Sequence, residues 1–137
     1  MEDCVFCKIT KDEVPSWKVY EDGTVTAFLD INPTNIGHTV VIPNKHFESF
    51  LKTPDDELAK LMSATKKIAQ AVKNGVLADG VNIMINNDRA AGQIIFHTHI
   101  HIVPRFVEDG FKHWRGKRQY KEGEQDEVVG KIRAHLT

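Results

Sequence analysis

The chain has 137 residues, 41% of them hydrophobic and 27% charged, with a formal net charge of -1 at pH 7. These values fit one globular domain over 1–137, exclude an intrinsically disordered chain, and give no broad electrostatic reason to bind nucleic acid or an anionic membrane. No apolar run approaches the roughly 20 residues of a membrane span, and the start MEDCVFCKIT does not resemble a secretory signal, so we expect a cytoplasmic protein.

Strands are the first elements predicted along the chain. Segments 17–20, 25–29 and 39–42 are rich in β-branched or aromatic residues, and Gly, Asp, Asn or Pro bounds them. Segments 81–85 and 96–103 repeat the pattern after a long helical stretch. Because short turns separate several of these segments, we expect an antiparallel five-stranded sheet.

A long helix is predicted between the third and fourth strands. We expect Thr53 as its N-cap, Pro54 at its first position and Gly75 at its end. A stripe at helical spacing could bind a partner helix or a membrane, but packing against the protein's own sheet is the commoner use and is our interpretation. The residues of this stripe are Leu58, Leu61, Met62, Thr65, Ile68, Ala69 and Val72.

A second, short helix is predicted over 124–136, with apolar residues on one side at Val128, Val129, Ile132 and Leu136. The preceding segment FKHWRGKRQYK is basic and contains aromatic residues, which could suggest RNA binding. It is short, however, and acidic residues follow at once, so we interpret it as a solvated loop. The predicted fold class is α+β, with one sheet, one long helix and a short C-terminal helix.

Histidines occupy alternate positions in HTHIHIV, at 97–103. If this segment is a strand, His97, His99 and His101 point to one face. They could be the wet side of a half-exposed strand, or they could bind zinc in a hydrolytic site. They could also supply a nucleophile, because the near-neutral pKa of imidazole leaves one ring nitrogen free to attack phosphorus.

The surrounding residues favour the nucleophile. Asn86, Asn87 and Gln93 carry neutral amides, which suit a phosphate that is already negative and are poor zinc ligands. Asp30 ends one predicted strand and His38 precedes another, so a carboxylate and an imidazole could border one pocket. Since a carboxylate can hold the two hydroxyls of ribose, we expect a nucleotide as the ligand.

Cys4 and Cys7 are the only cysteines of the chain. In a reducing compartment, a pair three positions apart favours a metal or redox role over a structural disulfide. A thioredoxin-like role is the weaker option, because no strand of a βαβ unit precedes the pair. Two unrelated buried cysteines are the remaining alternative.

HTHIHIV fits the H-x-H-x-H-x-x signature of the histidine triad (HIT) superfamily. Three blocks, CVFCKITKDEVPSWKVYED, AFLDINPTNIGHTVVIPNKH and INNDRAAGQIIFHTHIHIVPR, also resemble consecutive blocks of its small HINT-like branch. The resemblance covers most of 4–105, the expected core of the domain, and leaves 106–137 as a C-terminal loop and helix. It implies a HIT-like antiparallel sheet with a long helix across it, and a homodimer formed through that helix and a strand.

The resemblance implies an enzyme that hydrolyses or transfers purine nucleoside monophosphates. His99 matches the nucleophile that forms a covalent nucleotidyl-histidine intermediate. His101 matches a phosphate contact that also serves as general acid, and His38 matches a supporting, proton-handling histidine.

The resemblance also implies the residues that bind the substrate. Asp30 matches the ligand of the ribose hydroxyls, and Asn86 and Gln93 match positions near the phosphate and leaving group. A slot for the purine base is implied at Phe6, Ile9, Val14, Phe28 and Ile31, for which plain core packing is an equally good explanation.

In relatives that begin with C-x-x-C, the resemblance implies a structural zinc site of two cysteines and two histidines. Here the matching residues are Cys4, Cys7, His46 and His97, one zinc ion per chain, with no metal required at the chemical step. Ile94 is a departure, because several relatives have a serine or threonine there that can donate a hydrogen bond.

The leading hypothesis is a nucleoside phosphoramidase or related nucleotide hydrolase. Hydrolysis of diadenosine polyphosphates or adenylyl sulphate is a second option. A weakly catalytic nucleotide-binding regulatory protein is the third.

Overall fold

The structure is a computed structural model, and it describes residues 3–112, 114 and 116–136. Within them, five strands form one sheet: β1 Lys18–Glu21, β2 Val25–Leu29, β3 Thr39–Pro43, β4 Gly80–Met84 and β5 Ile100–Arg105. Their order across the sheet is β1-β2-β3-β5-β4, and neighbouring strands are antiparallel. The predicted α+β class and antiparallel five-stranded sheet are confirmed.

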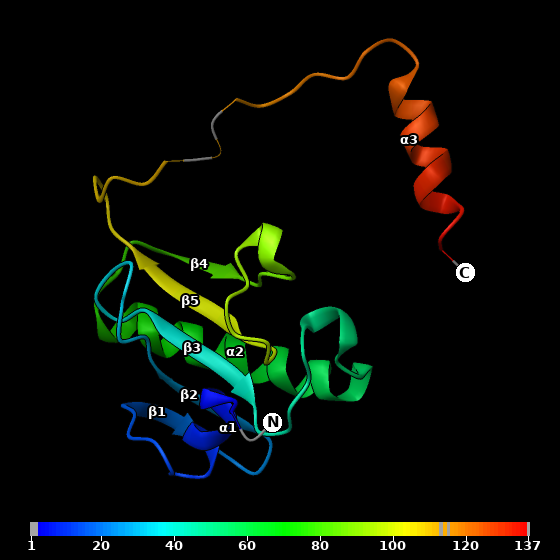
Figure 1. Cartoon of the computed structure of the whole chain (residues 1–137). Coiled ribbons are helices and arrows are strands. Elements are labelled where there is room, and N and C mark those ends of the chain that lie inside the picture. The colour runs from blue at the N-terminus through cyan, green and yellow to red at the C-terminus, as the bar shows by residue number, and fades with distance from the viewer. Residues whose placement is uncertain (1–2, 113, 115, 137) are drawn as a thin grey trace.

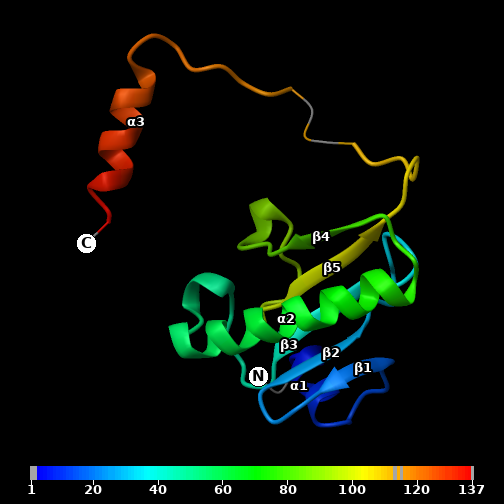
Figure 2. The same ribbon diagram turned by 180° about the vertical axis from the view of Figure 1, so that it is seen from behind.

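Helices lie on both faces of this sheet and beyond it. The long helix α2, Asp55–Gly75, crosses one face (Figure 2). The short helix α1, Val5–Thr10, packs on the opposite face, and α3, Glu124–Arg133, lies near the C-terminus (Figure 1). The two 3-10 helices are η1, Phe50–Lys52, and η2, Arg89–Ala91. We predicted α2 and α3 but not the three shorter elements.

The core has two layers because alternate residues of a strand face opposite sides of the sheet. In β3, Val41 packs with Leu61 of α2, whereas Val40 and Ile42 pack with Phe6 of α1. Complete burial of side chains of this size stabilises the fold by about 1.5–3 kcal/mol each. The central strands are thereby held from both sides, which makes them a firm support for side chains on the α1 face.

The start of α2 differs from the prediction. Its N-cap is Pro54 rather than Thr53, and no side-chain hydrogen bond forms at the cap. The Thr53 hydroxyl instead donates to the Ser49 carbonyl at 2.7 Å and lies 2.7 Å from the Thr98 hydroxyl. Thr53 therefore links the beginning of α2 to the histidine segment, because its side chain turns inward and is buried.

The predicted stripe of α2 packs onto the sheet as expected at Leu61, Thr65, Ile68 and Ala69, which are all buried. Leu58 and Val72 are half-buried, and Met62 is exposed over 41% of its surface. It lies beside β4, which forms one edge of the sheet. Among the described residues, no helix has the length and apolar character needed to cross a membrane.

The last strand begins later than predicted. β5 starts at Ile100, so 97–99 are irregular and only His101 of the three histidines lies in the strand. The alternation of faces nevertheless persists. His97 and His99 both meet the Phe6 ring of α1, while Ile100 packs in the core below α2. The expected common side of the histidines is therefore present, although the predicted strand limits are wrong.

Candidate active site and metal site

A cavity of about 610 Å³ lies on the α1 face of the sheet. This volume is within the usual range for small-molecule sites, roughly 300–1,000 Å³. One wall is apolar and includes every residue of the predicted base slot: Phe6, Ile9, Val14, Phe28 and Ile31. Phe6, Ile9 and Phe28 also belong to the buried core, so packing and cavity lining coexist there.

The polar residues predicted for chemistry and ribose binding line the same cavity. Asp30 and His38 come from the connection between β2 and β3, and Asn86 follows β4. His99 and His101 come from the segment that leads into β5. Polar residues from three parts of the chain therefore meet around one volume.

The His99 ring is oriented by the main chain of His97. Its Nδ1 lies 2.7 Å from the His97 carbonyl oxygen. Because a carbonyl oxygen can only accept, the ring proton is on Nδ1, and the neutral ring keeps a free lone pair on Nε2. Burial lowers the pKa of His99 from its ordinary 6.5, against smaller opposing effects of the His97 carbonyl and Asp30. His99 is therefore neutral at pH 7, the form that a nucleophile requires.

The tautomers of His38 and His101 follow from a second main-chain contact. The Thr34 N–H donates to His38 Nδ1 at 3.0 Å, so neutral His38 carries its proton on Nε2. That Nε2–H donates to His101 Nδ1 at 2.9 Å, which leaves the His101 proton on its own Nε2. Burial, followed by the proximity of His99 and His38, lowers the pKa of His101 to about 4. The Thr34 N–H and the His97 carbonyl therefore determine the tautomers: His101 offers an N–H donor at Nε2, and His99 offers an acceptor lone pair at Nε2.

Asp30 completes this group of polar side chains. Its carboxylate lies 3.6 Å from His38 Nε2, and its backbone N–H donates to the His38 carbonyl at 2.9 Å. Asp30, His38 and His101 are close enough to hold a metal ion. A metal on His38 Nε2 would need a proton on Nδ1, however, and that proton would face the Thr34 N–H. We therefore interpret the three residues as a proton-handling group.

His38 is brought into the site by a turn that requires glycine. Gly37 has a φ of +94°, and a Cβ there would lie 2.9 Å from Val76 Cγ1. A side chain would therefore meet both backbone strain and a clash with the residue that follows α2. The turn delivers His38 directly to the start of β3, where its ring is buried.

A second cluster contains the four residues of the predicted metal site. Cys4 Sγ lies 3.4 Å and Cys7 Sγ 3.6 Å from His97 Nδ1, while Cys7 Sγ and His46 Nδ1 are 3.4 Å apart. The two ring nitrogens, His46 Nδ1 and His97 Nδ1, are 3.2 Å apart. Tetrahedral zinc with ordinary bond lengths separates two nitrogens by about 3.3 Å and a nitrogen from a sulfur by about 3.6 Å. The donor set and its spacing therefore fit a tetrahedral metal ion.

The hydrogen bond and the protonation state of the His97 ring suit a metal ligand. Its Nε2–H donates to the Pro43 carbonyl at 2.8 Å, which leaves the lone pair of Nδ1 directed at the cysteines and His46. Burial lowers the pKa of His97 to about 4, so the ring is neutral at pH 7. Cys4 is the N-cap of α1, and Cys7 lies within that helix. The unpredicted helix α1 thus brings both sulfurs toward the sheet.

Gln93 is not where the prediction placed it. Its side chain is buried and does not line the cavity. The amide N–H groups donate to the Glu48 and Ile95 carbonyls, and the amide oxygen accepts from the Asp88 backbone. Gln93 therefore braces the loop before the histidines. Ile94, the departure from the family pattern, does line the cavity and is 86% exposed.

One residue of the site, Thr34, and one role of a predicted residue, Phe6, were not predicted from the sequence. Thr34 acts through its backbone, which no side-chain pattern reveals. Phe6 was predicted only as a base contact, but its ring also meets His97 and His99 edge-on at 5.8 and 5.2 Å between centroids. Its place within the C-x-x-C motif was the only available signal.

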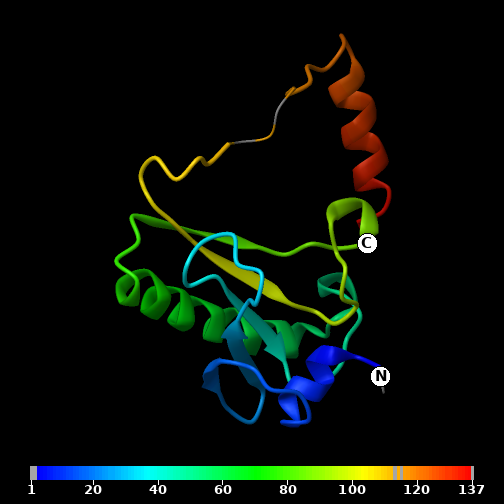
Figure 3. The ribbon, with the colours of Figure 1, turned by 60° about the vertical axis from the view of Figure 1, so that its left-hand side comes forward.

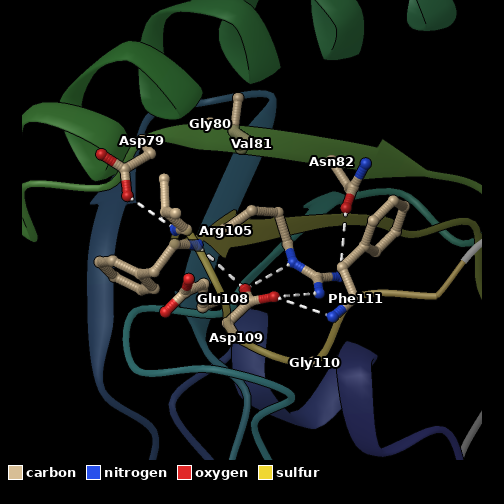
Figure 4. Close-up of a pocket in the computed structure, with 11 residues that line it drawn as sticks. Asp79, Gly80, Val81, Asn82, Arg105, Glu108, Asp109, Gly110 and Phe111 are labelled. Atoms are coloured by element: carbon tan, nitrogen blue, oxygen red, sulfur yellow. Dashed lines mark hydrogen bonds and ion pairs between the residues drawn. The ribbon is translucent and has the colours of Figure 1, made fainter.

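A more open hollow of about 740 Å³ lies elsewhere, where the chain leaves β5 (Figure 4). Three acidic side chains line it, at Asp79, Glu108 and Asp109, and its cation Arg105 is bound to Asp109. The triad histidines do not reach this hollow. The smaller cavity, which combines an apolar wall with His99 and His101, is therefore the candidate active site.

Several known proteins are similar to this chain in sequence. An uncharacterised HIT-like protein of Borreliella burgdorferi is 49% identical over 120 residues, 86% of each chain. Adenylylsulfatase HINT3 of Arabidopsis thaliana is 39% identical over 98% of this chain and 70% of its own. Adenosine 5'-monophosphoramidase HNT1 of Candida albicans is 37% identical over 74% of this chain and 70% of its own.

Solved structures show the same fold. A Streptococcus mutans protein, 40% identical, superposes with a TM-score of 0.94 over 100% of this chain and 87% of its own. A HIT family member from Bacillus subtilis, 38% identical, gives 0.91 over 98% of each chain. A zinc-bound histidine triad family protein from Mycobacterium smegmatis, 36% identical, gives 0.77 over 98% and 96%. Since the HIT domain model also matches residues 11–108, this chain belongs to the HIT domain family.

Proposed function

We propose that this chain binds purine nucleoside 5'-monophosphate derivatives and cleaves them through a covalent nucleotidyl intermediate on His99. The observation that carries the proposal is the 2.7 Å hydrogen bond from His99 Nδ1–H to the His97 carbonyl. It leaves a neutral imidazole with a free Nε2 in a cavity that also offers a carboxylate at Asp30 and an apolar wall. These features are suited to an electrophilic phosphorus, a ribose and a flat base.

The reaction has two displacement steps. In the first, His99 Nε2 attacks the α-phosphorus, an N–P bond forms and the bond between phosphorus and the leaving group breaks. In the second, water attacks the same phosphorus, the N–P bond breaks, and the water gives up a proton. In a transfer reaction, another acceptor attacks the phosphorus in place of water. The same imidazole is regenerated in either case.

His101 handles the proton in both steps. Its Nε2–H is available because His38 already donates to its Nδ1. The bound phosphate anion and the Asp30 carboxylate both favour an additional proton on the His38–His101 pair, and this proton goes to the leaving group. The pair takes a proton back from the attacking water. Asp30 also faces the cavity, where it can accept hydrogen bonds from the ribose hydroxyls.

Two relatives guide the choice of leaving group, since one is named an adenylylsulfatase and the other an adenosine 5'-monophosphoramidase. Ile94 lines the cavity of this chain and cannot hydrogen-bond to a leaving group. We therefore propose phosphoramidates or related adenylyl and guanylyl compounds as substrates. Diadenosine polyphosphates or adenylyl sulphate are the second candidates, because they need the same nucleophile and a different leaving-group contact. Asn86, which also lines the cavity, is proposed as a phosphate or leaving-group contact.

We propose one structural zinc ion per chain at Cys4, Cys7, His46 and His97. When bound, it would join α1 to the sheet, and no metal is required at His99. The spacing of the four donors supports this assignment. Cysteines that bind zinc must stay reduced, so the zinc proposal goes with a proposed cytoplasmic location.

We also propose that the chain forms a homodimer through β4 and α2. β4 is an edge strand of the sheet, with one side of its backbone unpaired within the described residues. Ile83 and Met84 of this strand are 45% and 43% exposed, and Met62 of α2 lies beside Ile83, whereas Met84 faces the candidate active-site cavity. A second copy would pair this edge and cover these apolar side chains.

A panel of adenylyl and guanylyl amides, anhydrides and dinucleotides tests the enzymatic proposal. The N–P bond to an imidazole is labile in acid, so turnover is quenched with denaturant at alkaline pH. Mass spectrometry of an alkaline digest should then find one nucleotidyl group on the peptide that contains His99. Nucleotide binding without turnover of any member of the panel would favour the regulatory alternative. A nucleotidyl group on any other residue would show that the nucleophile has been assigned wrongly.

A further inference from the structure

The C-terminal arm, residues 112–136, leaves the domain and ends in α3 (Figures 1 and 3). In both views α3 lies away from the sheet. Among the residues of the arm that the structure describes, hydrogen bonds and ion pairs form only within the arm itself. The match to the HIT domain ends at residue 108, so the arm is an addition to the shared domain.

The residues just before the arm, 105–111, are held in place by several contacts (Figure 4). Arg105 donates twice to the Asp109 carboxylate, from Nε at 2.9 Å and from Nη2 at 2.8 Å. Asn35 donates to the same carboxylate at 2.9 Å, and the Arg105 guanidinium lies 4.3 Å from the centre of the Phe111 ring. A paired, planar contact of this kind defines direction as well as distance. The arm therefore departs in a set direction from β5.

The helix at the end of the arm needs a surface to pack on. α3 has only ten residues, and helices shorter than about 12–15 residues are marginal in water without packing. Its apolar side is open: Val129 is 42%, Ile132 57% and Leu136 72% exposed. The row is the one that the sequence predicted for an amphipathic helix, but its own domain does not cover it.

Solved relatives show that the course of the arm is shared. The arm makes up nearly a fifth of the 137-residue chain. The Streptococcus mutans and Bacillus subtilis structures superpose with TM-scores of 0.94 and 0.91 over 100% and 98% of this chain. Scores this high require the arm and α3 to superpose as well. A surface present for all of these proteins must hold the arm, and another copy of the same chain meets that requirement.

Charge and position also favour a second copy. Residues 111–121 contain five Lys and Arg and no acidic residue, whereas residues 1–110 contain eleven Lys and Arg against fifteen Asp and Glu, a net charge of -4. This basic segment of the arm is therefore electrostatically attracted to the acidic body of another copy. Figure 1 shows the arm passing on the β4 side of the sheet, where the edge strand is open. A copy that paired with β4 would lie beneath it.

We propose that the arm of each chain crosses to a second copy and packs the apolar side of α3 on it, so that the two chains clasp each other. This inference rests on the dimer of the proposed function and is independent of the nucleotide chemistry. Its occupant is a second copy of this chain.

Photo-crosslinking in the full-length protein tests the crossing directly. A benzophenone-bearing amino acid replaces Gln125, which precedes Val129 by four residues and therefore shares its side of the helix. Irradiation should join two chains, and digestion should place the link between α3 and the body of the other chain. A link within one chain would show that α3 folds back on its own domain, and would overturn the proposal.

Hydrogen exchange supplies a second measurement. Amides of α3 should exchange at least about tenfold more slowly than in an unstructured chain. The double variant Val129→Glu and Ile132→Glu should lose this protection. Lys131→Glu, which changes the charge equally on the opposite side of the helix, should retain it. Absence of a crosslink together with unprotected α3 amides in the unaltered chain would also overturn the proposal.

Light scattering on the same samples separates this inference from the dimer itself. If the double variant remains dimeric while α3 loses protection, the β4 interface stands without the arm. If the unaltered chain is monomeric at all concentrations, both the dimer and the crossing arm are wrong. Turnover of nucleotides is measured separately, so failure of the proposed chemistry would be visible on its own.

Discussion

His99→Asn is the most informative perturbation of the proposed chemistry. The asparagine amide can still donate to the His97 carbonyl that holds Nδ1 of the native ring. It has no basic nitrogen, so the substitution removes the nucleophile while retaining the contact that orients the side chain. The histidine is 7% exposed, and its ring centre lies 5.2 Å from that of Phe6 and 5.0 Å from that of His101.

The expected loss is large because both chemical steps depend on the Nε2 lone pair. Removing a nucleophile from a protease site lowers kcat by about 10⁶, which corresponds to about 8 kcal/mol at about 1.36 kcal/mol for each factor of ten. Loss of packing around a smaller side chain should lower the free energy of unfolding by only about 1–2 kcal/mol. The variant should therefore remain folded while its kcat falls by several orders of magnitude.

The assay is single-turnover cleavage of an adenosine 5'-phosphoramidate, with product and protein-bound nucleotide measured together. His135→Asn, an exposed substitution in the C-terminal arm, is the matched control and should leave the rate unchanged. Thermal unfolding of both variants verifies that the fold is intact. A loss of less than about tenfold in folded His99→Asn protein would refute the assignment of the nucleophile.

Three other predictions follow from the same geometry. Burial lowers the pKa of His99 below 6.5, so the neutral ring predominates from pH 8 down to pH 6.5. The fall of kcat/KM toward acid pH that is caused by protonation of His99 should therefore be centred below pH 6.5. A fall centred above that value would contradict the assignment of His99. Metal analysis should find about one zinc per chain in the unaltered protein and none in Cys7→Ser. The Cys7→Ser variant should melt at least about 10 °C below the unaltered protein, and equal melting temperatures would exclude a structural metal. Ile94→Ser should change the free energy of unfolding by less than about 0.5 kcal/mol but shift the preference among leaving groups by up to about tenfold in kcat/KM; an unchanged preference would remove Ile94 from the specificity argument.

The parts of the site that follow periodicity could be read from the sequence. Alternation at 97–103 correctly separated the histidines from Ile100, because an extended backbone alternates its faces even where it forms no regular strand. Asp30 and His38 lie at the ends of adjacent antiparallel strands, and that topology brings them together. In these places the chemistry depends on backbone geometry that a pattern of residue types can encode.

The remaining features depend on long-range contacts that no local pattern records. Gln93 is close to the histidines in sequence, but its amide is taken up by the Glu48 carbonyl, 45 positions away. Thr53 looked like a helix cap, yet its hydroxyl is used by Ser49 and lies against Thr98. In both cases the polar side chain donates to a backbone carbonyl distant from its expected partner, and this hydrogen bond competes with the role that sequence position suggests.

The first histidine of the row connects the metal site with the nucleophile. The His97 ring belongs to the metal cluster, while its carbonyl accepts the hydrogen bond that places a proton on His99 Nδ1. With a metal ion bound, the His97 ring would be held by the Pro43 carbonyl on one side and by the ion on the other, so it could not rotate without moving its backbone. The direction of the His97 carbonyl, and with it the tautomer of His99, would then depend on the metal. Under the proposed mechanism, a metal ion away from the reacting atoms would influence the rate, because it would hold the main-chain oxygen that keeps Nε2 of His99 unprotonated.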